Sequence, residues 1–157
     1  FKTVQNKMHW AITGQTAAEI IHERANSIKR NMGLTSWRGP KVRKQDVTIA
    51  KNYLAEQELL ALNNLVEQYL IFAEGQALRR TPMHMADWIK KLDAFLSVNE
   101  REILTHADRI SHEMAEEMAE AEYEKFNRRR ISQKDRLEGD FERTIKQLTD
   151  GERGKKK

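Results

Sequence analysis

Apolar side chains at helical spacing open the chain. In and just before the stretch QNKMHWAITGQTAAEII (residues 5–21), the apolar positions are Val4, Met8, Ala11 and Ile12. This spacing predicts a short amphipathic helix. Gly14 follows it as the residue that adopts positive φ after a helix. Thr16 and Glu19 then form a capping box, which predicts a second helix to about Asn26.

The next segment, residues 27–46 (SIKRNMGLTSWRGPKVRKQD), has no sustained periodicity. Gly33, Gly39 and Pro40 interrupt it, so we expect a long loop. Loops of this length are uncommon in compact domains and are usually functional. Asp46 then provides the cap for a short helix that we expect to run to Tyr53.

Residues 54–80 show the clearest helical pattern in the chain, with a broad apolar face. That face carries Leu59, Leu62, Leu65, Val66, Tyr69, Leu70, Phe72, Ala73 and Ala77. Thr81 and Pro82 are typical of the first two positions of a helix. The helix that they predict has Met85, Trp88, Ile89, Leu92 and Phe95 on one side.

Two further N-cap residues predict helix starts in the remainder of the chain. Asn99 with Glu102 predicts a short helix to about His106, and Ser111 predicts the start of the last long helix. We expect that helix to break around residues 138–140. A short terminal helix would follow, with apolar residues Phe141, Ile145 and Leu148. Residues 151–157 (GERGKKK) are predicted to be a disordered basic tail.

Together these elements predict an all-α fold, an irregular bundle of about six or seven helices with one long basic loop. We expect a single helical domain over residues 1–150. The chain begins with Phe1 rather than Met, so we expect an upstream N-terminal segment to be missing. Trp10 lies away from the apolar stripe of its helix, and we expect a second element to cover it. The alternative is an exposed contact for a partner.

Composition narrows the class of protein. The 157 residues include no cysteine, which excludes disulfides, thiolate metal sites and a cysteine nucleophile. No apolar run approaches the roughly 20 residues that span a bilayer, and no signal peptide is present. The sequence therefore predicts a cytoplasmic protein that does not associate with membranes.

The charge pattern points to one candidate binding segment. The net charge is only +4, but cations dominate the stretch from Arg24 to Lys51. We predict a nucleic-acid site at Trp37, Arg38, Lys41, Arg43, Lys44 and Lys51. An aromatic ring can stack on a base, and neighbouring cations can bind phosphates. The alternative is that burial of Trp37 anchors the loop while the cations are solvated.

Acidic residues cluster further along, from Glu113 to Glu124. They form either a solvated helix face or a surface that binds the cations of residues 38–51 in another subunit. The long helix has a narrow apolar stripe, so it can also pair with a copy of itself. We therefore expect a protein partner or a homo-oligomer.

The opening helix–turn–helix raises the question of DNA recognition. A recognition helix presents hydrogen-bond donors at its exposed N-terminal positions. Here the second helix carries Glu19 and Glu23, which phosphates repel. A packed helical hairpin is the interpretation that we favour.

Motifs for catalysis are absent from the sequence. The five histidines form no His-x-x-x-His pair, and a repeated Glu-x-x-His motif is missing. There is no P-loop, Gly-x-Gly-x-x-Gly run or nucleophile elbow. We expect no catalytic residues, metal or cofactor. An enzyme that uses His9, His84 or His106 with nearby carboxylates is a third hypothesis, and it requires these residues to converge in one pocket.

Several strings together resemble one known family. They are VQNKMHWAITGQTAAEII, NMGLTSW, DVTIAKNYLAEQELLALNNLVEQYLIFAE, MHMADWIKKLDAFL and NEREILTHADRISHEMA. In this order they resemble the RhuM-type virulence protein family of bacteria, from about Val4 to Leu148. Two positions depart from the family's pattern: Ala55 replaces a polar cap before the long helix, and Asp108 replaces a common glycine.

The resemblance implies a virulence-associated protein with no established catalytic residues. Family members are often described as DNA-binding and lie near restriction–modification loci, and some are fused to Fic-type domains. Our leading hypothesis is therefore a non-enzymatic regulatory or accessory protein that associates with DNA through the basic loop. The alternative is a protein-interaction or oligomerisation module.

Overall fold

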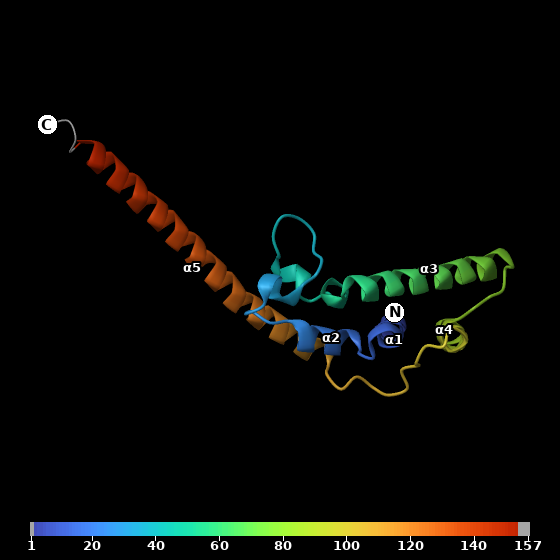
Figure 1. Ribbon diagram of the computed structural model, residues 1–157. Helices are drawn as coiled ribbons and strands as arrows, with labels where there is room; N and C mark the ends of the chain where they lie inside the picture. The colour runs from blue at the N-terminus through green and yellow to red at the C-terminus, as the bar shows by residue number, and fades with distance from the viewer. Residues whose placement is uncertain (1, 154–157) are drawn as a thin grey trace.

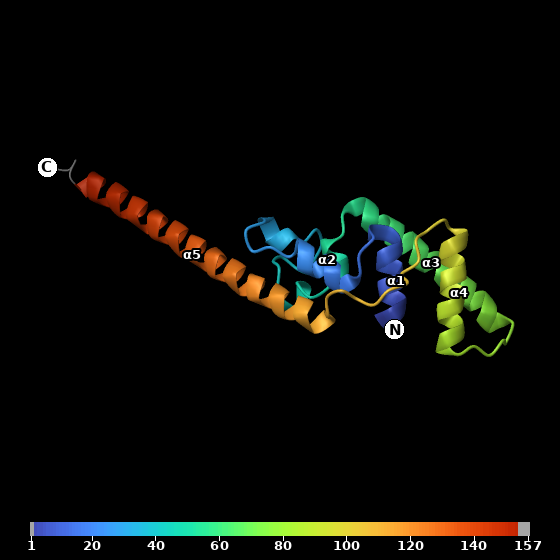
Figure 2. The same cartoon turned by 90° about the horizontal axis from the view of Figure 1, so that it is seen from below.

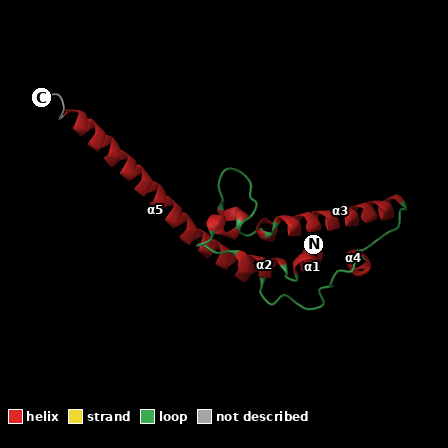
Figure 3. Ribbon diagram, viewed as in Figure 1, coloured by secondary structure: helices red, strands yellow, loops and turns green. Residues whose placement is uncertain are grey.

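The computed structural model describes residues 2–153, and side chains within residues 2–146. Those residues form helices and connecting segments only, without a strand (Figure 3). The α-helices are α1 (Lys2–Thr13), α2 (Ala17–Arg24), α3 (Glu56–Leu78), α4 (Met85–Val98) and α5 (His112–Arg153). Three short 3-10 helices are η1 (Arg30–Gly33), η2 (Lys44–Asp46) and η3 (Ala50–Tyr53). The predicted all-α class is confirmed, but the described part has five α-helices rather than six or seven.

The helices form a compact body from which one helix extends. α1 contacts α2, α3 and α4, while α2 also contacts η3 and the first part of α5. Figure 2 shows α1 between α2 on one side and α3 and α4 on the other. The C-terminal half of α5 projects away from this body (Figure 1). No helix in the described range is long and apolar enough to span a membrane.

The predicted turn between the first two helices is confirmed. Gly14 has φ +70°, and its N–H donates to the Trp10 carbonyl at 2.8 Å. Thr16 caps α2: its hydroxyl accepts the Glu19 N–H, and the Glu19 carboxylate accepts the Thr16 N–H at 2.9 Å. Glu19 and Ile20 of α2 are buried, and α2 packs against α5 and η3 as well as α1.

The main core lies where α2, η1, η3 and the start of α5 meet. Its fully buried side chains include Ile20, Ile21, Met32, Val47, Tyr53 and Leu54. The Tyr53 hydroxyl donates to the Val47 carbonyl at 2.7 Å, so its burial leaves no unpaired polar group. A second part of the core forms around Leu92 and Leu96 of α4.

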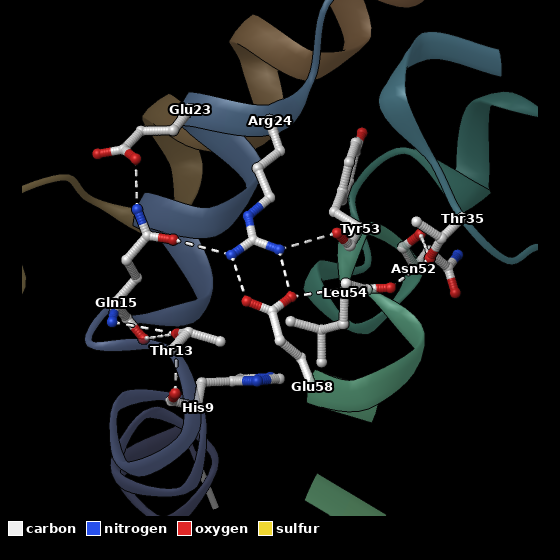
Figure 4. A network of polar contacts seen from close by, with 11 residues as sticks. His9, Thr13, Gln15, Glu23, Arg24, Thr35, Asn52, Tyr53, Leu54 and Glu58 are labelled. Atoms are coloured by element: carbon white, nitrogen blue, oxygen red, sulfur yellow. Dashed lines mark hydrogen bonds and ion pairs between the residues drawn. The ribbon is translucent and has the colours of Figure 1, made fainter. Parts of the chain in front are cut away.

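An ion pair supports the start of α3, where Ala55 cannot cap through its side chain. The Glu58 carboxylate accepts the Ala55 N–H at 2.8 Å. The same carboxylate binds Arg24 of α2 through two hydrogen bonds of 2.6 and 2.9 Å. Arg24 also donates to the Tyr53 carbonyl at 3.0 Å (Figure 4). The Glu58 half of the capping box therefore remains, and Arg24 of α2 adds an ion pair to it.

Three predicted boundaries were wrong. α4 begins after His84 rather than at Thr81, because Asp87 accepts the His84 N–H at 3.0 Å. Asn99 starts no helix: its amide donates to the Phe95 carbonyl at 2.8 Å and so caps the end of α4. α5 continues through Gly139 to Arg153 instead of breaking at residues 138–140. The side chain of Leu148 and the tail beyond Arg153 lie outside the described residues.

The segment between α4 and α5, residues 99–111, covers one side of α1. The Trp10 ring packs edge-on against His106 with their centroids 4.7 Å apart. Lys7 donates to the Leu104 carbonyl at 3.1 Å, and the Asn6 amide lies 3.0 Å from both Asp108 carboxylate oxygens. A second element does cover Trp10, as predicted, and Asp108 fastens that element to α1.

Candidate nucleic-acid interface

The basic loop is held by hydrogen bonds where it leaves the body and is exposed at its tip. Thr35 bonds through its N–H to the Asn52 carbonyl and through its hydroxyl to the Leu54 carbonyl. The Asn52 amide donates to the Asp46 carbonyl at 2.9 Å, and Val42 is buried. Residues 38–41, which include Gly39 at φ +92°, are exposed. Arg38 and Lys41 are therefore exposed on a loop whose base is held by hydrogen bonds.

The six residues of the predicted nucleic-acid site have different surroundings in the structure. Arg38, Lys41 and Arg43 are exposed and form no ion pair within the described part of the chain. Trp37 is half-buried and packs against the core, as the anchoring alternative expects. Lys44 is paired with Glu120 of α5 at 3.0 Å, which raises the pKa of Lys44. Lys51 lies apart from the loop tip, at a cavity beside α1 and α3.

Helix α5 binds the loop through side chains that the sequence analysis did not assign to the site. Arg130 donates to the Val42 carbonyl and Arg129 to the Ser27 carbonyl, both at 3.4 Å. Glu122 accepts the Ser27 N–H at 2.7 Å. These contacts place Ser27 and Val42, the latter between Lys41 and Arg43, against α5. The acidic stretch of α5 meets Lys44 within the same chain, so this pairing requires no second subunit.

A row of hydrogen-bond donors continues along α5 from these contacts. Arg129, Ser132, Gln133 and Arg136 recur at helical spacing, so they share one face. With Arg128 they line a shallow hollow of about 420 Å³ that has no carboxylate in its wall. The spacing was readable in the sequence, but only the contacts with the loop show that this face joins the basic loop.

We call the combined set the basic surface: Arg38, Lys41, Arg43, Arg128, Arg129 and Arg136. Arg128 approaches Glu124 only at 3.9 Å, and its side chain is 81% exposed. An exposed cation with so weak a partner remains available to a phosphate. The basic surface can therefore bind an extended polyanion from two directions, the loop and the helix.

The histidines do not assemble a reaction centre. His9 is buried at the cavity beside Lys51, His106 packs on Trp10, and His84 is exposed before α4. His9 and His106 line two different cavities, neither of which contains His84, and residues 2–153 hold no metal-binding cluster of histidine and carboxylates. The condition set for the enzyme hypothesis, convergence in one pocket, is not met.

Glu122 makes the attachment of the loop to α5 dependent on pH. Hydrogen bonds from Lys125 and from the Ser27 N–H lower the pKa of Glu122 to about 2. The pKa of this carboxyl is lower in the folded than in the unfolded protein. Its ionised form therefore stabilises the fold at any pH above the pKa of the unfolded state, and this contribution is lost as the pH falls toward 2. We expect Glu122→Gln to lower the free energy of unfolding by about 1 kcal/mol at neutral pH.

Urea denaturation at a series of pH values measures this effect. The difference between the two proteins should shrink as the pH falls from 5 toward 2, because the wild-type carboxyl then becomes neutral too. Glu117→Gln, an exposed change on the same helix, serves as the control. A constant difference across this range would contradict the assignment.

Comparison with known proteins identifies a family. No curated protein and no solved structure matches the chain. A family model described as "Virulence protein RhuM family" matches residues 1–134. The matched residues contain the whole helical body, the basic loop and the first part of the donor row on α5.

Proposed function

The chain belongs to the virulence protein RhuM family, and on this premise we propose that it is a non-enzymatic regulatory or accessory protein that binds duplex DNA through the basic surface. The observation that carries the proposal is the contact of Arg130 of α5 with Val42, which lies between the loop cations Lys41 and Arg43, next to a carboxylate-free row of donors on the same helix. Cations in such numbers supply the sequence-independent part of DNA affinity by displacing counterions from phosphates.

The shape of α5 suits a duplex. Beyond its contacts with the loop, this helix extends away from the body (Figure 2), and an exposed helix fits the major groove of B-DNA. Arg129, Gln133 and Arg136 are residue types that can bond to base edges or phosphates there. In the proposed arrangement the loop cations contact the phosphate backbone of the DNA beside that groove, while Trp37 anchors the loop.

Fluorescence anisotropy with a labelled duplex tests the proposal, from about 50 mM to about 300 mM salt. The variant Arg38→Gln/Lys41→Gln/Arg43→Gln should bind about thirtyfold more weakly at the lower salt concentration, with a shallower salt dependence. Arg129→Gln/Arg136→Gln should also weaken binding.

The matched control removes three positive charges elsewhere. Lys90, Lys91 and Arg101 are exposed and lie on or just after α4, at the other end of the body (Figure 1). Their replacement by glutamine should change affinity by less than about threefold. Absence of binding by the folded wild-type protein at the lower salt concentration would refute the proposal. Equal losses in the two triple variants would refute the location.

The apolar stripe of the projecting helix favours a second candidate function, self-association. Leu137 and Phe141 are 71% and 67% exposed, and Ile145, the next residue in the stripe, is 45% exposed. The stripe continues the face on which Ala115 and Ala119 pack against the body. A second copy offers an identical stripe, and symmetric pairing would bury both. Light scattering on the wild type and on Leu137→Gln/Phe141→Gln distinguishes a dimer from a monomer.

A further inference from the structure

A cavity of about 520 Å³ lies on the side of the body formed by α1, α2 and α3. Its volume falls within the range of small-molecule sites. Met8, Ile21 and Leu62 provide buried apolar walls, and Val66 is half-buried beside them. Residues 48–51 line another side, so five segments of the chain, including the start of α5, contribute to one pocket that is partly open to solvent.

His9 in this wall has hydrogen-bonding capacity that the protein does not use. The side chain is only 8% exposed, and its Nδ1 is buried without a partner among the described residues. Burial lowers the pKa of His9, so the ring is neutral at neutral pH and offers one donor and one acceptor. A buried polar group without a partner is costly, so it marks this wall as a place where a bound molecule can add a contact.

The exposed rim of the cavity favours an anion. Lys51 and Asn63 are both exposed there. His112 also lines the cavity, and its Nε2 lies 3.0 Å from Glu116 Oε1. No aspartate or glutamate is among the lining residues. The cavity thus combines an interior that is apolar apart from His9 with a rim that carries one cation, Lys51.

We propose that this cavity binds a small amphipathic carboxylate, with its hydrocarbon part against Met8, Ile21, Leu62 and Val66 and its carboxylate at Lys51 and Asn63. The site shares no residue with the basic surface, so it is independent of the proposed DNA binding. It is a second, small-molecule site on the same chain.

Octanoate is the probe for this site, and NMR of the full chain is the measurement. Octanoate should cause saturable shifts of the Met8 methyl and His9 ring signals, with a Kd on the order of 1 mM or tighter. Octan-1-ol has a similar chain without the charge and serves as the reference ligand. Shifts that do not saturate, or that miss both residues, would overturn the proposal.

Two variants locate the ligand within the cavity. Lys51→Met keeps the aliphatic stem and should weaken octanoate about threefold while leaving octan-1-ol unchanged. Lys41→Met removes the same charge from the loop tip and should change neither ligand. Val66→Phe fills the cavity and should weaken both ligands at least about tenfold. If Val66→Phe does not fold, the Lys51→Met comparison still decides, and equal binding of octanoate by Lys51→Met and Lys41→Met would refute the assigned rim.

Discussion

Replacement of Gly33 by alanine is expected to lower the free energy of unfolding by about 3 kcal/mol or more. Gly33 has φ +84°, and a Cβ built there would lie 2.5 Å from the Arg24 carbonyl oxygen. That oxygen belongs to the backbone at the end of α2, so it cannot move aside as a flexible side chain would. The substitution therefore combines left-handed backbone strain with a backbone clash.

The surrounding turn has little capacity to absorb this change. Asn31 and Met32 already have φ of 51° and 60°. The Met32 carbonyl accepts the Asn26 N–H at 3.1 Å, and the Met32 side chain is fully buried. Displacement of Gly33 would pull Met32 out of the core. Part of the stability loss should therefore come from core packing.

Gly14→Ala is the matched control for this prediction. Gly14 has a similar φ of +70°, but a Cβ there would meet nothing within 4 Å. Only the backbone strain applies, and we expect a loss of about 1 kcal/mol. Urea denaturation followed by circular dichroism gives both values. Equal losses at the two glycines would show that the close approach to Arg24 does not exist in solution.

The second large effect is expected where α2 packs on α5. Ala119 of α5 is fully buried, as is Ala115 one turn before it; α2 contributes the buried Ala18, and Ala25, which caps the end of α2, is buried too. Side chains of this size allow two helices to approach closely. Ala119→Leu adds three carbon atoms where no space is left, and we expect a loss of about 3 kcal/mol.

Ala121→Leu provides the control on the same helix. Ala121 is exposed, and alanine and leucine have similar helix propensities, so stability should change by less than about 0.5 kcal/mol. Chemical denaturation compares the two variants. Ala119→Leu should also expose α5 to limited proteolysis, because α2 and the loop hold this helix to the body. Equal stability of the two variants would contradict the close packing of α2 on α5.

Ala119→Leu also bears on the proposed DNA binding. The basic surface exists only while α5 lies against the loop, through Arg129, Arg130 and Glu122. Partial detachment of α5 should lower DNA affinity although every cation of the surface is still present. In the same assay, Ala121→Leu should bind as the wild type does.

The sequence by itself determined the features that depend on neighbouring residues. Gly14, Thr16 and Glu19 were sufficient to predict the first turn, because a positive φ and a capping box are satisfied within a few residues. The apolar faces of α3 and α4 predicted both helices, because helical spacing is also a pattern among neighbouring residues. The all-α class and the family resemblance followed from such local patterns in order along the chain.

Local sequence patterns gave wrong helix boundaries where the same residue is compatible with two different structures. Asn99 can start a helix or close one, and in the fold its amide caps the end of α4. Gly139 can end a helix, but α5 continues through it. A single glycine costs a helix only about 1 kcal/mol relative to alanine, so it weakens the helix without requiring a break.

Only the tertiary structure decided how the candidate site is composed. Lys44 was grouped with the loop cations, yet Glu120, distant in sequence, pairs with it. Arg129 joined the site because it and its neighbour Arg130 bond to carbonyls about a hundred residues earlier in the chain. Spacing along a sequence specifies which residues share a helix face. Which distant segment that face meets depends on packing of the whole chain, and this packing brings the loop and α5 together.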